Sequence, residues 1–402
     1  MNLNYMAIAV PFFLTFIAIE YLVAKRMGRK VFHFNSSIAN MNVGIAERLI
    51  DMFTAAAFYF FYEYLHQHYA IFNIQSTLLT WIALILVTDL IWYWYHRFGH
   101  KVNLFWAFHV VHHTSEEFNY TAGTRITIFQ AVVRTLFWAV LPVIGFPAPM
   151  ITVMLIVHGL YPFFTHTQLI GKLGILEYIL VTPSHHRVHH ASNEAYLDKN
   201  FGDMFIIWDK LFGTFAEEEE EAKYGLTKQL DSYSFLWQHF HYLVELWYAA
   251  KSKTGIVNKI KLFFGSPADF DPEVRAIVEK KFLSKHKVRV STQKFRAYVL
   301  VQFSAMLIML FFILLFEHHT DFFLQAMAAL VILMTLINCG AILEQRRWVF
   351  FLELVRGFLI VFTTFYYFSH PTTFVLLSLF TVGSLVYFST LQRQYLNTIY
   401  GR

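Results

Sequence analysis

Eight histidines fall into three short groups whose spacing is typical of a metal site. The groups read HRFGH, HVVHH and HRVHH in one-letter code. Spacings of three and four residues place the imidazoles of one group on one helical face, about one turn apart. The eight residues are His96 and His100, then His109, His112 and His113, then His186, His189 and His190.

The number of these histidines predicts more than one metal ion. Imidazole nitrogen suits iron, copper, nickel and zinc, and one ion needs only three or four protein ligands. Cys339 is the only cysteine, which excludes cysteine-ligated iron–sulfur clusters and intrachain disulfides and argues against a structural zinc finger. We therefore expect a redox or hydrolytic centre rather than a patch of pH-sensing or fortuitous histidines.

Other histidines carry weaker signals. His166, in the string FTHTQ, is a candidate to complete the metal shell, and His158 is a weaker one. His185 adjoins the third group but breaks its spacing, so we expect it behind the ligands or as a bystander. The remaining candidates for purely structural or surface roles are His66, His68, His239, His241, His318 and His319.

Asp89 and Tyr93 lie seven and three residues before His96 and share its helical face. An ionisable residue inside a membrane span is costly and marks a functional site by default. Carboxylates commonly accept the free N–H of a ligating histidine. We expect Asp89 to orient His96 in this way; the alternative is a packing hydrogen bond to a neighbouring span.

Composition predicts an all-α, polytopic membrane protein with about nine embedded helices. The chain is 57% hydrophobic and 19% aromatic, whereas soluble domains are about 45 to 50% apolar. Spans need roughly 17 to 25 apolar residues. The candidate segments, of which the fourth and fifth form a hairpin, are 5–24, 49–65, 78–95, 132–144, 150–164, 298–316, 322–337, 348–368 and 374–390. The first lacks a cleavage site and is expected to be retained.

Lysine and arginine predict the orientation, because short cytoplasmic loops carry their excess. Four basic residues follow the first span within 25–30, whereas the loops 66–76 and 317–321 carry none. Alternation then places the N-terminus outside and the segments 96–125 and 171–296 inside, with all three histidine groups. We expect a cytoplasmic metal site on a bacterial inner membrane or the endoplasmic reticulum.

The distribution of histidines, charged residues and hydrophobic spans divides the chain into three parts. They are a catalytic membrane domain (1–265), a polar connector (266–296) and a four-span C-terminal region (297–402) without an assignable role. The acidic run 217–221 reads as a solvated loop, because adjacent like charges repel. The net charge of +5 suits basic loops beside anionic lipid, and no nucleic-acid motif is apparent. The oligomeric state is left open.

Neutral imidazole ligands leave metal ions more electron-poor than the carboxylates of helical-bundle diiron sites. An all-histidine pair can activate O2, and the resulting oxidant suits an unactivated C–H bond. Beside a membrane that bond belongs to a lipid. No HPGG, GxGxxG or G-x-S-x-G string is present, so electrons come from elsewhere and no serine hydrolase is indicated. A metal transporter is the alternative of a different class, but its ligands should lie near the bilayer midplane.

Three strings carry a family resemblance: TPSHHRVHHASNEAYLDKNFGDMFIIWDKLFGTF (182–215), NLFWAFHVVHHTSEEFNYTAGTR (103–125) and FTHTQLIGKLGILEYIL. With the ordered histidine groups they resemble the fatty acid hydroxylase and sterol desaturase superfamily of membrane diiron oxygenases, and within it the alkylglycerol monooxygenase branch. The similarity runs from about Thr88 to Leu226. It implies that the eight histidines ligate two irons and that O2 hydroxylates the ether-bearing carbon of an alkylglycerol, giving a hemiacetal that collapses to an aldehyde. Hydroxylation or desaturation of another lipid is the alternative.

One position departs from that branch, whose members carry Glu directly after the second histidine where this chain has Lys101. Glu116 and Asn119 do match it. We expect these three residues to contact the reductant, which stays open between tetrahydrobiopterin and an electron-donor protein. Asp198 and Asn200, in the string that follows the third group, are expected to support the ligands from behind.

Overall fold

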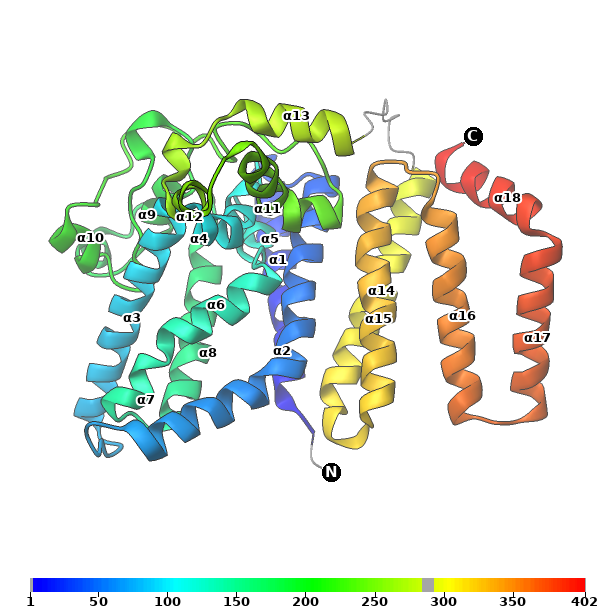
Figure 1. The fold of residues 1–402 in the computed structure, drawn as a ribbon, viewed down its shortest axis with the longest axis horizontal. Coiled ribbons are helices and arrows are strands. Elements are labelled where there is room, and N and C mark those ends of the chain that lie inside the picture. Colours follow the sequence, from blue (N-terminus) through cyan, green and yellow to red (C-terminus); the bar gives the residue numbers. More distant parts are fainter. Residues whose placement is uncertain (1–2, 284–292, 402) are drawn as a thin grey trace. The chain divides into compact units, whose positions relative to one another are not determined.

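The computed structural model describes residues 3–283 and 293–401, whose regular secondary structure is helical apart from two isolated β-bridges, Leu180 with Phe205 and Ala191 with Tyr224 (Figure 1). The predicted all-helical membrane fold is confirmed. Residues 284–292, part of the predicted connector, lie outside the described residues. The α-helices are α1 (Ala9–Arg26), α2 (Phe34–Tyr69), α3 (Leu78–Lys101), α4 (Asn103–His109), α5 (Tyr120–Gly123), α6 (Ile128–Trp138), α7 (Val140–Ile144), α8 (Ala148–Thr165), α9 (Pro183–His189), α10 (Ile207–Phe212), α11 (Phe235–Ser252), α12 (Ile256–Phe264), α13 (Glu273–Phe282), α14 (Gln293–Leu315), α15 (Phe322–Leu343), α16 (Val349–Tyr367), α17 (Pro371–Val386) and α18 (Phe388–Tyr400). Short 3-10 helices include η2 (Val110–Thr114) and η5 (Pro267–Asp269).

Six of the described helices are long and apolar enough to cross a membrane, or seven if the bent pair α17 and α18 is one span. They are Tyr5–Arg26, α3, α8, α14, α15 and α16. The predicted count of nine is thus approximate. The predicted arm 132–144 divides into α6 and α7 around Ala139, and α17 and α18 meet at 85°.

The chain forms two compact units. One comprises Met1–Phe16, Ser232–Trp237 and Lys285–Arg402, and the other comprises Ile17–Asp231 and Gln238–Ser284. The second unit holds every histidine of the three groups. Residues 266–283, predicted as connector, belong to this unit as well.

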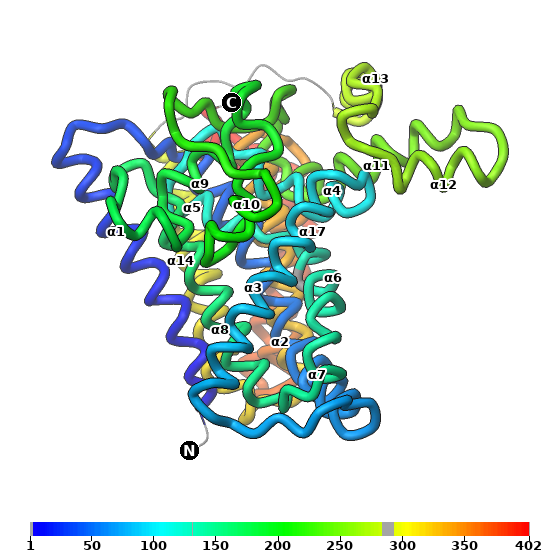
Figure 2. Tube along the Cα trace, turned by 90° about the vertical axis from the view of Figure 1, so that its left-hand side faces the viewer, coloured from blue at the N-terminus to red at the C-terminus, as the bar shows by residue number. Residues whose placement is uncertain are grey.

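Within the histidine-bearing unit, α8 packs against both α2 and α3 (Figures 1 and 2). The core that these three helices form with α7 contains Tyr62, Leu84, Leu141 and Ile151, all at most 2% exposed. The short helices α4, α5, α9 and α10 lie at the end where α3 finishes. The long helices therefore supply the support, and the short ones fold over their ends and carry most of the histidines.

In the unit that contains α14 to α18, the helices follow one another as neighbours, each packing on the next. A polar network joins three of them: Arg356 on α16 donates to Thr335 (2.8 Å) and Gln302 (2.6 Å) and pairs with Glu353. Glu353 also accepts from Asn338 at 2.6 Å. Such bonds hold apolar helices in register where a hydrophobic driving force between them is lacking.

Candidate metal centre

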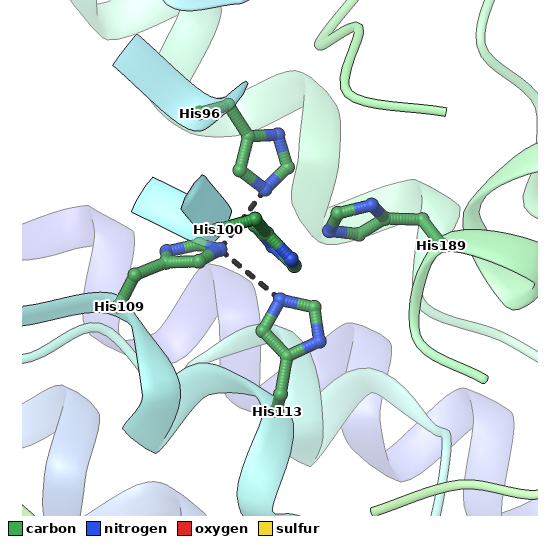
Figure 3. Close-up of side chains that lie close together, drawn as sticks. All are labelled: His96, His100, His109, His113 and His189. Atoms are coloured by element: carbon green, nitrogen blue, oxygen red, sulfur yellow. Dashed lines mark hydrogen bonds between the residues drawn. The ribbon is translucent and has the colours of Figure 1, made fainter. Parts of the chain in front are cut away.

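Five histidines from α3, α4, η2 and α9 form one cluster, with one nitrogen from each within 4.8 Å of the others (Figure 3). They are His96, His100, His109, His113 and His189. In Figure 3 the rings point toward a common centre. The Nε2 atom of His109 lies 2.9 Å from that of His96 and 3.1 Å from that of His113.

Four other histidines form a second cluster by the same criterion: His112, His166, His186 and His190. The Nε2 atom of His166 lies 3.0 Å from that of His186, 3.2 Å from that of His190 and 3.3 Å from that of His112. The structure thus brings together all eight histidines of the three groups, and His166 with them. The two histidines of each HH pair belong to different clusters. His113 and His189 lie in the five-histidine cluster, whereas His112 and His190 lie in the four-histidine cluster.

Hydrogen bonds fix which ring nitrogen carries the proton. The Nδ1 atoms of His112 and His166 lie 3.1 and 2.6 Å from the carbonyl oxygens of Arg125 and Pro162. A carbonyl oxygen only accepts, so Nδ1 is the protonated atom and the neutral ring presents a lone pair at Nε2. Two lone pairs at 3.3 Å cannot form a hydrogen bond. A cation bound between the two Nε2 atoms would account for their short distance.

The spacing of these nitrogens suits coordination. Two nitrogens bound at about 2.0–2.1 Å from one ion, at angles of 90–110°, are about 2.9–3.4 Å apart. The Nε2 distances in both clusters fall in that range. In the five-histidine cluster, the buried Nε2 atoms of His100 and His189 have no hydrogen-bond partner among the described residues. Both clusters can therefore bind metal.

Burial keeps the imidazoles neutral, as metal ligands must be. Loss of solvation, and then repulsion by neighbouring imidazoles, holds the pKa well below the ordinary histidine value at six positions outside the membrane spans. These are His109, His112, His113, His186, His189 and His190. Burial lowers the pKa of His166 to about 4.

One backbone segment, 198–203, orients three ligands of the five-histidine cluster. The Phe201 carbonyl lies 2.8 Å from His96 Nδ1, and the Lys199 carbonyl lies 2.9 Å from His189 Nδ1. Asp198 Oδ1 lies 3.6 Å from His100 Nδ1. Partners of this kind set the tautomer and direction of a ligating ring.

The same segment holds an unusual backbone conformation. Asp198 and Asn200 have φ values of 59° and 55°, a region that non-glycine residues seldom adopt. Asn200 is fully buried and compensates with its side chain, donating to the carbonyls of His185 (3.1 Å) and Ala216 (2.8 Å) and accepting from the Ala216 amide (2.9 Å). Asp198 and Asn200 thus lie behind the cluster, where the sequence predicted them.

Asp209 is a residue that sequence reasoning missed. It is fully buried, and its two oxygens accept from the amides of Phe201 (2.7 Å) and Gly202 (2.8 Å). Burial raises the pKa of this carboxyl, against the effect of these bonds and of one from Thr214. Asp209 thereby fixes the peptide whose carbonyl bonds His96. Its place in the string WDKLFGT was the available signal.

The structure does not show Asp89 on His96, contrary to our expectation. Asp89 accepts from the amides of Met204 (2.9 Å) and Phe205 (3.1 Å) and from Trp208 Nε1 (2.9 Å). His96 instead has the Phe201 carbonyl as its Nδ1 partner. A seven-residue spacing places the side chains of Asp89 and His96 on one helical face. The loop 201–205, which the sequence pattern does not reveal, bonds each of these side chains separately. The alternative, a hydrogen bond to a neighbouring span, is not shown by these contacts either, because the three partners lie in the loop before α10 and in α10 itself.

Two other predicted positions also differ. Tyr93 contacts Thr214 (2.9 Å) and Arg97 (3.1 Å) rather than His96. His158 lies outside both clusters, with its Nδ1 2.7 Å from Asp203 Oδ2. His185 is buried at the start of α9, where its Nδ1 accepts from the Thr182 amide at 3.3 Å.

Arg125 is a second residue that the sequence did not single out. It is 2% exposed and donates to the Val111 carbonyl (2.8 Å), to Asn40 (2.7 Å), and to Thr114 and Gln238. Among residues 3–283 and 293–401 no carboxylate pairs with it, and burial lowers the pKa of its guanidinium to about 9. Its side chain braces η2 while its carbonyl bonds His112. A lone basic residue just beyond the second group was the signal.

The three residues predicted to contact a reductant have different surroundings. Lys101 is half-exposed and pairs with Asp198 at 2.5 Å. Partial burial raises the pKa of Asp198, but hydrogen bonds to His100 and Lys101 outweigh this effect and lower the pKa to about 2. Glu116 is exposed, whereas Asn119 is buried, caps α5 and donates to the Val31 carbonyl at 2.5 Å. Asn119 is thus engaged by the protein itself.

Comparisons with known proteins agree with this site. A family described as fatty acid hydroxylase matches residues 81–214. An alkylglycerol monooxygenase from Homo sapiens is 31% identical over 384 residues, which cover 91% of this chain and 83% of that protein. Another from Danio rerio is 30% identical over 366 residues, covering 89% and 82%. The ornithine lipid hydroxylase OlsE from Rhizobium tropici is 29% identical over 124 residues, covering 31% and 38%. No solved structure matches the chain. With histidines from residues 96 to 190 gathered into two clusters that could hold metal, the chain belongs to the alkylglycerol monooxygenase family of membrane oxygenases.

Proposed function

We propose that this chain uses O2 to hydroxylate the ether-bearing carbon of an alkylglycerol, with one iron in each histidine cluster. The observation that carries the proposal is the pair of adjacent clusters, five and four imidazoles, whose Nε2 lone pairs face one another. The family is iron-dependent, and imidazole is a common iron ligand. Bound iron would supply the binding and reductive activation of O2.

The balance of the reaction sets what else is needed. One oxygen atom enters the substrate C–H bond, and the other leaves as water after taking two electrons and two protons. The hydroxylated carbon then carries both a hydroxyl and an ether oxygen, a hemiacetal that breaks into a fatty aldehyde and a glycerol derivative. The electrons come from a reduced pterin or from an electron-donor protein, because the sequence shows neither a heme nor a dinucleotide motif.

The place of the clusters in the fold supports a lipid substrate. His96 and His100 lie in the last turns of α3, and His166 follows the last residue of α8 directly. Both helices are candidate membrane spans. A lipid tail can therefore remain among the spans while its head end reaches the clusters. By the charge of the loops this face is cytoplasmic, and we assign catalysis to residues 1–265.

Hydroxylation of another lipid is the second candidate function. It is favoured by the shorter similarity to the ornithine lipid hydroxylase, which covers 31% of this chain. The two candidates share the metal centre and differ in the carbon attacked. Only the ether substrate releases an aldehyde.

The test uses the full chain purified in lipid nanodiscs and loaded with iron. We expect about two irons per chain and release of fatty aldehyde from an alkylglycerol that depends on O2 and a reductant. A His166→Ala variant serves as the matched inactive control. Hydroxylation of another lipid without aldehyde release would support the oxygenase activity but refute the ether substrate. A chain that binds no transition metal would refute the proposed centre.

A further inference from the structure

Helix α12 (Ile256–Phe264) exposes an apolar face that none of the described residues of its unit covers. Ile256, Val257, Ile260 and Phe264 are 70%, 59%, 51% and 60% exposed. At 100° per residue these four positions fall within an arc of about 100°. Leu262, on the opposite side of the helix, and Phe263, next to the edge of the arc, pack on the core around α4 and η2. The helix therefore uses its inner side for the fold and leaves an apolar stripe outside.

Basic residues flank that stripe, and acidic residues are missing from it. Between Glu245 and Asp269 the sequence contains four lysines and no Asp or Glu. By the same helical geometry Lys259 and Lys261 lie on either side of the apolar arc. Lysines so placed can extend their ammonium groups toward headgroups while their stems cover apolar surface. An apolar stripe between lysines is typical of a helix that lies in an anionic membrane interface.

The anchoring of α12 sets its depth. Asn103, two residues beyond the end of α3, donates its side-chain amide to the Leu262 carbonyl (2.8 Å) and its backbone amide to the Gly265 carbonyl (2.9 Å). The hydroxyl of Tyr242 donates to the side-chain oxygen of Asn103 at 2.6 Å. Because α3 is a candidate span, α12 is held at the level where that span leaves the hydrocarbon.

The direction of α12 agrees with this depth. Figure 1 shows the helix nearly end-on and Figure 2 shows it from the side, so that it runs across the direction of α3. Gly255, with φ of 76°, provides the turn from α11 into α12. On α11, Trp247 is also exposed, with Lys251 Nζ 3.4 Å from the centre of its ring.

We propose that α12 is a membrane-interface helix that buries its apolar stripe in the headgroup region of an anionic leaflet. The partner is the lipid surface, selected by the lysines through their charge and by the stripe through its apolar area. Since α12 bonds Asn103 at the start of α4, and α4 ends at His109, the lipid surface and the metal-binding region share one support. The inference does not depend on which lipid the enzyme oxidises.

The test measures where the stripe lies in the full chain. A nitroxide is attached to Ile260→Cys in nanodiscs of phosphatidylcholine with or without phosphatidylglycerol; native Cys339 is buried, and the unmodified chain reports its background. In anionic nanodiscs we expect the label to be accessible to O2 and shielded from a water-soluble nickel complex. A label at exposed Glu219→Cys is the aqueous control. An Ile260 label as open to nickel as the Glu219 label would overturn the proposal and favour a protein partner for this face.

Charge removal tests the anionic selectivity. Each lysine near such a surface contributes about fivefold, so Lys259→Gln with Lys261→Gln should lower the ratio of inserted to free α12 by about 25-fold. The double variant Lys280→Gln and Lys281→Gln, on neighbouring α13, removes the same charge and should leave the shielding unchanged. Equal shielding of Ile260 in neutral and anionic nanodiscs, with no effect of the α12 lysines, would overturn the anionic preference.

Discussion

The two histidine clusters are built from the same kind of ligand but are supported in different ways. Behind the five-histidine cluster, one short segment presents Asp198 and the carbonyls of Lys199 and Phe201 to three different rings. Behind the four-histidine cluster, the carbonyls of Arg125 and Pro162 come from separate elements. Orientation is thus concentrated in one loop for the first cluster and distributed for the second.

Because one segment, 198–203, supports three rings of the five-histidine cluster, its backbone must adopt a particular conformation. Two non-glycine residues with positive φ cost about 1 to 3 kcal/mol each, and the side-chain bonds of Asn200 and Asp209 offset this cost. Strain of this kind persists only where surrounding contacts enforce it. The five-histidine cluster should therefore respond to changes far from its ligands, provided that they loosen segment 198–203.

The largest expected effect is the loss of a ligand. We expect His166→Ala to lose most of its iron from the four-histidine cluster, because three ligands remain, whereas His189→Ala leaves four in the other cluster. His166→Ala should therefore fall from about two irons toward one, His189→Ala should keep more of its iron, and both variants should lose turnover. Elemental analysis of the purified chains measures this, with His239→Gln, a buried histidine outside both clusters, as the control.

The outcome can break the comparison between clusters. Loss of both irons in either variant would mean that the adjacent pairs His112–His113 and His189–His190 make the clusters a single unit. Loss of iron in the His239 control would mean that any buried histidine affects the fold.

A smaller effect is expected from changes behind the ligands. Asp209→Asn converts one of the two acceptor oxygens into a donor that faces an amide N–H, and should weaken iron binding about 10-fold to 100-fold in the five-histidine cluster. Arg125→Lys keeps the charge but loses the planar fork, and should act on the four-histidine cluster through His112. Release of iron to a chelator should then show one fast and one slow ion in each variant. Equal acceleration of both ions would refute separate supports.

The sequence predicted which histidines gather in the two clusters, because three- and four-residue spacing follows directly from helical geometry. It also indicated His166, Asp198 and Asn200 near the site. It did not predict that the residues of each HH pair point to different clusters, since side-chain direction depends on how η2 and α9 meet. Asp89 was misplaced because a shared helical face says nothing about the loop that packs against it. Arg125 and Asp209 act through backbone groups, which leave no periodic pattern.

The smallest expected effect concerns Lys101, the residue that departs from the ether-cleaving branch. The structure pairs its ammonium with Asp198 at 2.5 Å, and both side chains are substantially exposed, at 48% and 36%. An exposed pair contributes about 0 to 1 kcal/mol, so Lys101→Gln should leave iron content unchanged, because Asp198 keeps its place beside His100. If Lys101 meets the reductant at the edge of the five-histidine cluster, its loss should raise the KM for that reductant up to about fivefold and leave kcat unchanged. The measurement is aldehyde release with a reduced pterin and, separately, with an electron-donor protein. A fall in kcat at constant KM would show instead that Lys101 acts on the centre through Asp198, and would extend the concentrated support of this cluster by one residue.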